Sequence, residues 1–454
     1  MAMNLKEKLS EKNGIIHQYG IFLKWLIVST LLGVVIGAAG ACFHLLLDKA
    51  AEVRTENSVL ICFLPVAGLL IVWIYSICGM SGDKGTNGII LGARGEERVS
   101  LKTAPLIVAA TLLTHLFGGS AGREGAALQL GGSLASPAGR IFRLSDDDYS
   151  LVIMCGMAAG FSALFGTPGA AAVFATEVTV IGLTRYSAIV PCVISSITAA
   201  FTARLFGVFP TAFDVAAVPD FDSGSAGTLL RALALGIGGA VVSVLFCFVI
   251  ESAAKAYGRI FKNKYLRVFI GGVIVAGLSF LIYIPTGRFD YNGAGTDIIG
   301  NALAGQCRPE AFIVKLILTA LTLGAGFKGG EIVPTLFVGS TFGCVFGGLI
   351  GLPPSFGAAL GMAAVFCGVT NCPFASLLLS IELFGSGGLP YYVLVIGMSY
   401  MLSGYRGLYS AQKFYGNKFG KADEGKIFSY KEYIKEKNEI AENSDTENKS
   451  PEDY

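Results

Sequence analysis

Charged residues are scarce in this chain of 454 amino acids. Lys, Arg, Asp and Glu make up 15% of it, against 53% hydrophobic residues. A soluble protein of this length needs far more charge to cover its surface, so the scarcity excludes that class and indicates a polytopic membrane protein. The formal net charge of +2 is too small to suggest nucleic acid as a partner.

Metal-binding and disulfide patterns are also lacking. The ten cysteines lie scattered, most of them in apolar runs, with no Cys-x-x-Cys pair and no cluster with the three histidines. We predict packing roles for them, with no metal and no cofactor. No cleavable signal peptide precedes the apolar run 21–47, so this run is expected to remain as a membrane span. We find no nucleophile paired with a base, and therefore predict that the chain is not an enzyme.

Glycine, by contrast, is abundant, with 60 residues, and it interrupts many apolar segments. A perpendicular membrane helix needs roughly 20 apolar residues, and several segments are shorter. We predict an all-α polytopic fold with short, tilted and broken helices buried in protein. The apolar segments lie near 21–47, 58–80, 103–117, 148–163, 168–183, 187–207, 227–253, 267–285, 311–325, 333–350, 355–370, 373–384 and 390–403.

The two halves of the chain repeat each other. The string Gly-Met-Ala-Ala at 156–159 recurs at 361–364, and the same offset carries Glu177 to Glu382. Broken, glycine-rich segments at matching places in two halves point to a transport site at the repeat interface. We predict the following organisation: a cytoplasmic N-terminal helix at 1–17, repeat one at 18–210, a linker at 211–226, repeat two at 227–415 and a charged cytoplasmic tail at 416–454.

Two acids stand on glycine-rich breaks between apolar segments. Glu124 lies in Gly-Arg-Glu-Gly at 122–125, and Glu331 follows Gly329 and Gly330 in the second half. A carboxylate at membrane depth is costly unless it lines an aqueous path or meets backbone donors. Glycine-rich sequence before a helix start supplies such donors, because free N–H groups and the helix dipole converge there. Together with 85–89, the chain offers three such starts, which indicates an anion pathway.

Five motifs follow one another along the apolar part of the chain. They are Gly-Arg-Glu-Gly at 122–125 with Gln129, Gly-Thr-Pro-Gly-Ala-Ala at 166–171 with Glu177, Tyr-Asn-Gly-Ala-Gly at 291–295, the stretch from Lys328 to Pro334, and Leu-Tyr-Ser-Ala at 408–411. These motifs resemble those of the CLC family of anion channels and proton-coupled anion transporters. The resemblance implies two inverted repeats, a homodimer with one pore per subunit, a place in the cell membrane and cytoplasmic termini, without CBS domains.

The resemblance assigns roles residue by residue. Glu124 is implied to be the gating glutamate and Tyr409 the inner-gate tyrosine that faces the central anion. Arg123 is expected beside the path, holding carbonyls or a carboxylate, because a cation in the path would trap the anion. The residues expected around the anion are Asn87, Gly88, Arg123, Gly125, Ile332, Val333 and Tyr409.

Departures from the chloride-type pattern favour fluoride. Asn87 stands where chloride-type members have the central serine, Val178 replaces their inner proton-transfer glutamate, and Ala126 replaces a proline. Fluoride is small and strongly hydrated, and Asn87 offers two amide N–H donors where serine offers one hydroxyl. Glu331 matches an acid of the fluoride-transporting branch and, if protonated, is the candidate inner proton carrier. Val333 counts against this branch, which often has threonine there.

The favoured function is therefore fluoride export in exchange for protons. A CLC-type chloride/proton exchanger and a passive chloride channel remain open as alternatives. Glu177 and Glu382 are expected to cap or bridge helices, and Asp146–Asp148 to form a helix N-cap. The polar tail from 416 is expected to be solvated, and partly helical or disordered.

Overall fold

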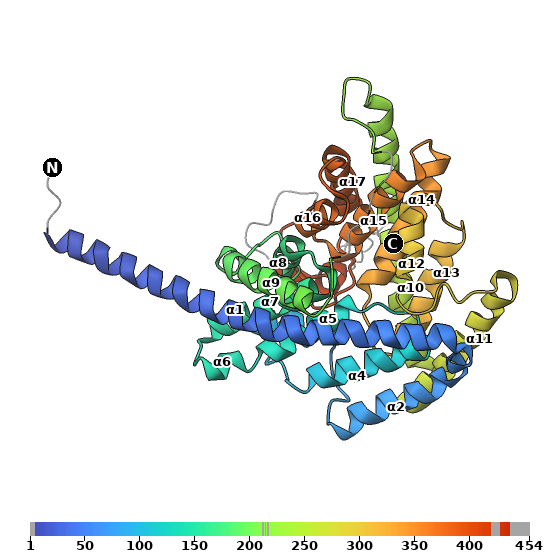
Figure 1. Ribbon diagram of the computed structural model, residues 1–454, viewed down its shortest axis with the longest axis horizontal. Coiled ribbons are helices and arrows are strands. Elements are labelled where there is room, and N and C mark those ends of the chain that lie inside the picture. Colours follow the sequence, from blue (N-terminus) through green and yellow to red (C-terminus); the bar gives the residue numbers. More distant parts are fainter. Residues whose placement is uncertain (1–4, 211–212, 214, 216–217, 419–426, 436–454) are drawn as a thin grey trace, which may run out of the picture.

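The chain folds into a bundle of helices of very unequal length (Figure 1). The computed structural model describes residues 5–210, 213, 215, 218–418 and 427–435, with side chains from residue 17 onward. The first half contains α1 (Leu5–Glu56), the 3-10 helix η1 (Ser58–Phe63), α2 (Leu64–Ile77), α3 (Thr86–Ala93), α4 (Thr103–Leu116), α5 (Glu124–Ala135), α6 (Ala138–Ile141), α7 (Asp146–Phe165), α8 (Pro168–Glu177), β1 (Val180–Ile181) and α9 (Tyr186–Leu205). The second half contains α10 (Ala226–Ile260), α11 (Lys264–Thr286), α12 (Thr296–Leu303), α13 (Ala311–Ala325), α14 (Ile332–Leu349), α15 (Pro354–Thr370), α16 (Pro373–Phe384), α17 (Leu389–Leu402), β2 (Lys413–Tyr415) and β3 (Ile427–Ser429).

The prediction of a polytopic membrane protein with short and broken helices is confirmed. Within the described residues, seven helical segments are long and apolar enough to cross a membrane, and five further apolar helices are shorter. The N-terminal part of α1 extends away from the other helices (Figure 1). Since α1 is continuous from Leu5 to Glu56, it passes the expected boundary between 17 and 18 without a break.

The repeated Gly-Met-Ala-Ala strings lie where helices pack almost backbone to backbone. A Cβ added at Gly156 in α7 would lie 2.4 Å from the carbonyl oxygen of Gly131 in α5. In the second half, a Cβ added at Gly361 in α15 would lie 2.4 Å from the carbonyl oxygen of Gly339 in α14. Only glycine permits these approaches, so the sequence repeat reflects a repeated helix packing.

The two repeats cap each other's helices. Glu177, at the end of α8, accepts hydrogen bonds from the backbone N–H groups of Phe374 (3.2 Å) and Ala375 (2.9 Å) in the first turn of α16. Glu382, near the end of α16, accepts from Gly169 (2.8 Å) and Ala170 (2.9 Å) in the first turn of α8. The predicted capping roles are confirmed, and the exchange requires α8 and α16 to run antiparallel, as inverted repeats demand.

The predicted N-cap at Asp146–Asp148 differs from the structure. The N-cap of α7 is Ser145, whose hydroxyl accepts from the N–H of Asp148 (3.2 Å), so the three aspartates form the first turn instead. Their charges suit that turn because the helix dipole is positive there.

The described part of the tail is not free in solvent. Strand β2 pairs in parallel with β1 of the first half and antiparallel with β3. Tyr405, Phe414, Phe428 and Tyr433 pack into one aromatic cluster beside this sheet. Tyr405 and Phe414 are buried, and Phe428 and Tyr433 of the tail are partly buried against them. Residues 419–426 and 436–454 of the predicted tail lie outside the described residues.

Candidate functional site

Each of the three glycine-rich segments leads directly into a helix, as the sequence predicted. Helix α3 begins at Thr86, α5 at Glu124 and α14 at Ile332. The starts of α5 and α14 are joined by a short antiparallel bridge, in which Gly122 and Gly330 each donate an N–H to the other's carbonyl at 2.7 Å. The repeat interface therefore brings two helix N-termini to one place, where their free N–H groups favour an anion.

Glycine is required at this contact for steric reasons. A Cβ added at Gly330 would lie 2.6 Å from the backbone nitrogen of Gly125 and 3.0 Å from that of Glu124. A Cβ added at Gly125 would lie 2.9 Å from the Cα of Gly330. A side chain at Gly330 would therefore press on the N–H groups that open α5, and one at Gly125 would press on the backbone of Gly330.

Glu124 lies folded over the start of its own helix. Its side chain is only 1% exposed, and its Oε2 accepts a hydrogen bond from the backbone N–H of Arg123 at 3.1 Å. The carboxylate thus occupies the position at the helix N-terminus that an anion would take. Beside it lies a void of about 20 Å³, which Val333, Leu336 and Met362 help to line. This void is of the size of one water molecule.

Arg123 holds two carboxylates. Its Nε lies 3.4 Å from Oε1 of Glu124, and its Nη1 lies 3.2 Å from Oδ1 of Asp48 in α1. The Arg123 side chain is 12% exposed, and its guanidinium group lies between the carboxylate of Glu124 and that of Asp48, an acid that the sequence did not single out. This geometry agrees with the expected anchoring role of Arg123. Its backbone N–H lies closer to the Glu124 carboxylate than its guanidinium group does.

Tyr409 comes from the segment that follows α17. It is 4% exposed, and its hydroxyl oxygen has no hydrogen-bond partner among the described residues. The carboxyl groups of Glu331 and Glu124 lie close enough for their charges to act on this hydroxyl. A buried hydroxyl is costly without a partner, so its position suits contact with a transported ion or water.

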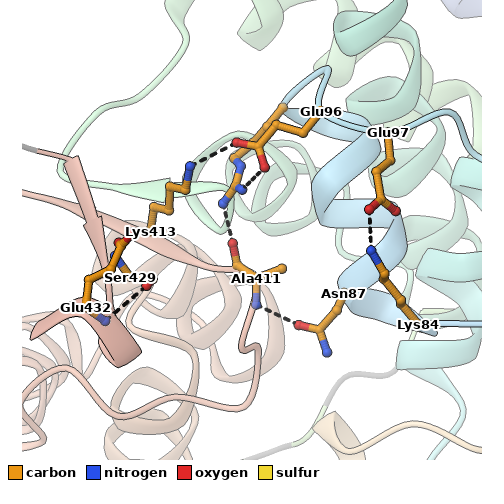
Figure 2. Close-up of polar contacts among 9 residues, drawn as sticks. Lys84, Asn87, Glu96, Glu97, Ala411, Lys413, Ser429 and Glu432 are labelled. Atoms are coloured by element: carbon orange, nitrogen blue, oxygen red, sulfur yellow. Dashed lines mark hydrogen bonds and ion pairs between the residues drawn. The ribbon is translucent and has the colours of Figure 1, made fainter. Parts of the chain in front are cut away.

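Asn87, in the first turn of α3, accepts a hydrogen bond through its Oδ1 from the backbone N–H of Ala411 at 2.9 Å (Figure 2). Its Nδ2 makes no hydrogen bond to the described residues. The neighbouring Gly88 is partly exposed, whereas Ile332 and Val333 in the first turn of α14 are buried.

The two acids differ in their surroundings. Glu331 is the N-cap residue of α14 and partly exposed, and its carboxylate makes no hydrogen bond or ion pair within the described chain. The charge of Lys328 acts on it. Val178, which the resemblance matches to the inner glutamate of chloride exchangers, is fully buried in the core. Glu331 is thus an acid near Tyr409 whose side chain is not committed to a structural contact.

Some polar contacts of the site were not predicted from the sequence, although Gln129 was noted there as part of a motif. Gln129 donates from Nε2 to the hydroxyl of Thr86 at 3.2 Å, which ties α5 to the start of α3. Neither Gln129 nor Thr86 carries a charge that would draw attention in the sequence. For Asp48, the sequence shows only an acid just after the apolar run 21–47. The string 118–122 also has the Gly-x-Ser-x-Gly pattern of serine hydrolases. Its Ser120 hydroxyl bonds the carbonyl of Tyr291 and the hydroxyl of Thr319, and neither group is a base.

The fold and the site together define a membrane protein of two inverted repeats whose broken helices meet at a buried acid. The sequence family described as "Voltage gated chloride channel" matches residues 67–404. The chain belongs to this family.

Individual relatives agree with this assignment. A "Chloride/fluoride channel protein" of Pseudomonas syringae pv. tomato is 34% identical over 395 residues, which cover 86% of each chain. An "H(+)/Cl(-) exchange transporter ClcA" of Vibrio parahaemolyticus is 29% identical and covers 79% of this chain and 81% of its own. Among solved structures, a "CLC-type fluoride/proton antiporter" matches with a TM-score of 0.82 at 34% identity, covering 87% of this chain and 99% of the other. A slow cyanobacterial Cl⁻/H⁺ antiporter, with a TM-score of 0.72, 18% identity and coverage of 84% of this chain and 94% of its own, shares the fold.

Proposed function

We propose that this protein is a proton-coupled anion antiporter that exports fluoride in exchange for protons. The single observation that carries the proposal is the position of Glu124, whose carboxylate lies over the N-terminus of α5 in a buried site. There it competes directly with an anion for the same donors. The similarity to a "CLC-type fluoride/proton antiporter" and to a "Chloride/fluoride channel protein" supports this function.

The chain's own groups suggest how exchange proceeds. Ionised Glu124 is held by the backbone N–H of Arg123 and by the helix dipole, and it closes the path. Protonation removes its negative charge and so weakens these interactions, which lets the side chain leave and an anion enter. Tyr409 then contributes its buried hydroxyl from the other side of the anion position. Proton and anion movement are coupled because one site serves either the carboxylate or the anion.

The preference for fluoride rests on Asn87, Val178 and Glu331. Asn87 has an uncommitted amide N–H₂ group, which provides strong donors for a small, strongly hydrated anion. The inner acid of chloride exchangers is replaced by Val178, so the proton needs another carrier. Glu331 supplies one, since its carboxyl interacts with Tyr409 and is free of structural contacts within the described chain.

We propose further that the protein works as a homodimer in the cell membrane, with both termini in the cytoplasm. Helix α9 carries exposed apolar side chains that include Val190, Ile197, Phe201 and Leu205. Such a face suits contact with lipid or with a second copy of the chain.

Fluxes from proteoliposomes test the proposed function. We expect fluoride to leave loaded vesicles faster than chloride, and a fluoride gradient to drive proton uptake against a pH gradient. Faster chloride movement with proton coupling would assign the protein to the chloride/proton exchangers. Anion movement without any proton movement would make it a passive channel. The Glu124→Gln variant is the matched control for coupling.

A further inference from the structure

The backbone of Ala411 is held from two sides by α3 and the residue that ends it. Its N–H donates to Oδ1 of Asn87 at the start of α3, at 2.9 Å. Its carbonyl oxygen accepts from Nη1 of Arg94, the C-cap residue of the same helix. Figure 2 shows the contact between Ala411 and Asn87 and the ion pair between Lys413 and Glu96.

The contact with Ala411 decides which end of the Asn87 amide is free. A carboxamide has an acceptor oxygen at one end and two N–H donors at the other. A backbone N–H can only donate, so the atom of Asn87 that faces Ala411 must be the oxygen. The amide nitrogen is therefore left for another partner. An anion requires donors, and a rotated amide would present its oxygen and repel the anion.

Arg94 is itself held firmly. Its side chain is 8% exposed, and its Nη2 pairs with Oε2 of Glu96. The other carboxylate oxygen of Glu96 accepts from Nζ of Lys413 at 3.0 Å. Glu96 thus joins Arg94 to a residue two positions beyond Ala411. These contacts form one connected network, and we call Arg94, Glu96 and Lys413 the clamp.

We propose that Arg94 is a positioning residue for anion recognition. It fixes the Ala411 peptide so that Asn87 presents its N–H₂ group, and not its oxygen, to the transported anion. The inference rests on the proposed function and deepens it, because it names a residue outside the anion path that sets anion preference.

A purely structural role for Arg94 makes a different prediction. If the clamp only stabilised the fold, its loss would slow all anions by the same factor. If it orients the amide, its loss must harm the anion that depends most on strong donors. The ratio of fluoride to chloride transport separates these cases, since changes in protein amount or stability cancel in a ratio.

The first experiment measures that ratio in proteoliposomes for Arg94→Met and Arg94→Lys. We expect Arg94→Met to lower it about fivefold, the effect of one hydrogen bond of ordinary strength. Arg94→Lys keeps the charge and can still donate a hydrogen bond, so its ratio should lie between that of the unmutated protein and that of Arg94→Met. The matched control is Arg98→Met, because Arg98 lies on the same loop, is 65% exposed and pairs with Asp146. It should leave the ratio unchanged.

The second experiment asks whether Arg94 acts through Asn87. In an Asn87→Ala background the amide is absent, so Arg94→Met should have no further effect on the ratio. Additive effects of the two substitutions, or an unchanged ratio in Arg94→Met alone, would overturn the proposal. The cycle can be measured whichever anion the unmutated protein prefers. A protein that favours chloride would contradict the proposed fluoride export, yet the cycle would still show whether Arg94 and Asn87 are coupled.

Discussion

Gly122 and Gly330 exchange two backbone hydrogen bonds of 2.7 Å across the interface of the two repeats. Gly122 stands two residues before Glu124, and Gly330 stands one residue before Glu331. The bridge fixes the starts of α5 and α14 relative to each other, so neither acid-bearing helix can shift without the other. Five testable consequences concern this region and the contacts around it.

Glu124→Gln imitates the protonated side chain and cannot change its charge. We therefore expect anion movement to continue while proton movement driven by an anion gradient falls to the background of empty vesicles. Simultaneous recordings with a fluoride electrode and a pH electrode provide the measurement. Persistent proton uptake in this variant would show that Glu124 is not the gate.

Glu331→Gln and Glu331→Ala distinguish a proton carrier from a helix cap. The amide of Gln can still donate to an anion but cannot carry a proton, so binding should persist while coupled turnover falls about tenfold or more. Glu331→Ala should lose both anion binding and coupled turnover. Isothermal titration with fluoride and coupled flux assays measure the two separately. Unmutated rates in both variants would make Glu331 a structural residue and direct the search for the proton route to Tyr409.

Glu177→Gln should weaken the fold and spare coupling. The Glu177 carboxylate accepts two backbone N–H bonds at the start of α16, and Gln can accept with only its one oxygen and without charge. We expect a loss of roughly 1–2 kcal/mol in stability, visible as a lower thermal midpoint in detergent. Glu382→Gln should behave alike, because it caps α8 in the same way. Loss of proton coupling in Glu177→Gln alone would instead give this acid a transport role.

Gly330→Ala tests the close approach of α5 and α14. The added Cβ would lie 2.6 Å from the nitrogen of Gly125, so the two helix starts must separate, at a cost of about 1–3 kcal/mol. Anion binding should fall, because the N–H groups that open α5 would be displaced. Gly300→Ala in α12 is the control, since a Cβ there meets no atom within 4 Å. Equal anion affinity in the two variants would contradict a role for the bridge.

The clamp should be insensitive to pH in the neutral range. Burial raises the pKa of Glu96, but hydrogen bonds and charge from Arg94 and Lys413 outweigh burial and hold this pKa below its ordinary value of 4.5. Because the folded-state pKa is lowered, the stabilisation is present above 4.5 and is lost as pH falls through the lowered value. The fold change that Arg94→Met causes in the fluoride-to-chloride ratio should therefore be the same at pH 7.5 and at about pH 5.5. A Glu96→Gln variant measures the contribution of this carboxylate, as the change it causes in the fluoride-to-chloride ratio at neutral pH.

The sequence by itself determined the membrane class, the repeat and the three helix starts. Scarce charge and long apolar segments indicate that the chain lies in a membrane. An acid next to glycine at membrane depth indicates an aqueous path or backbone donors for the carboxylate. The reciprocal caps were also predictable, because Glu177 and Glu382 occupy matching places near the ends of two short helices. These features are local, or they repeat at a constant spacing, so they can be read along the chain.

Only the tertiary structure decided which distant groups meet. Arg94 and Ala411 are separated by 317 positions, and Arg123 and Asp48 by 75. No sequence periodicity or repeat offset predicts either contact. The sheet β1–β2–β3 likewise required the end of α8 and the segment after α17 to come together. The orientation of the Asn87 amide follows from such a contact, since the terminal torsion of Asn has only a broad preference until a fixed N–H selects the oxygen. Side-chain direction depends on neighbours that the fold supplies, and the sequence does not name those neighbours.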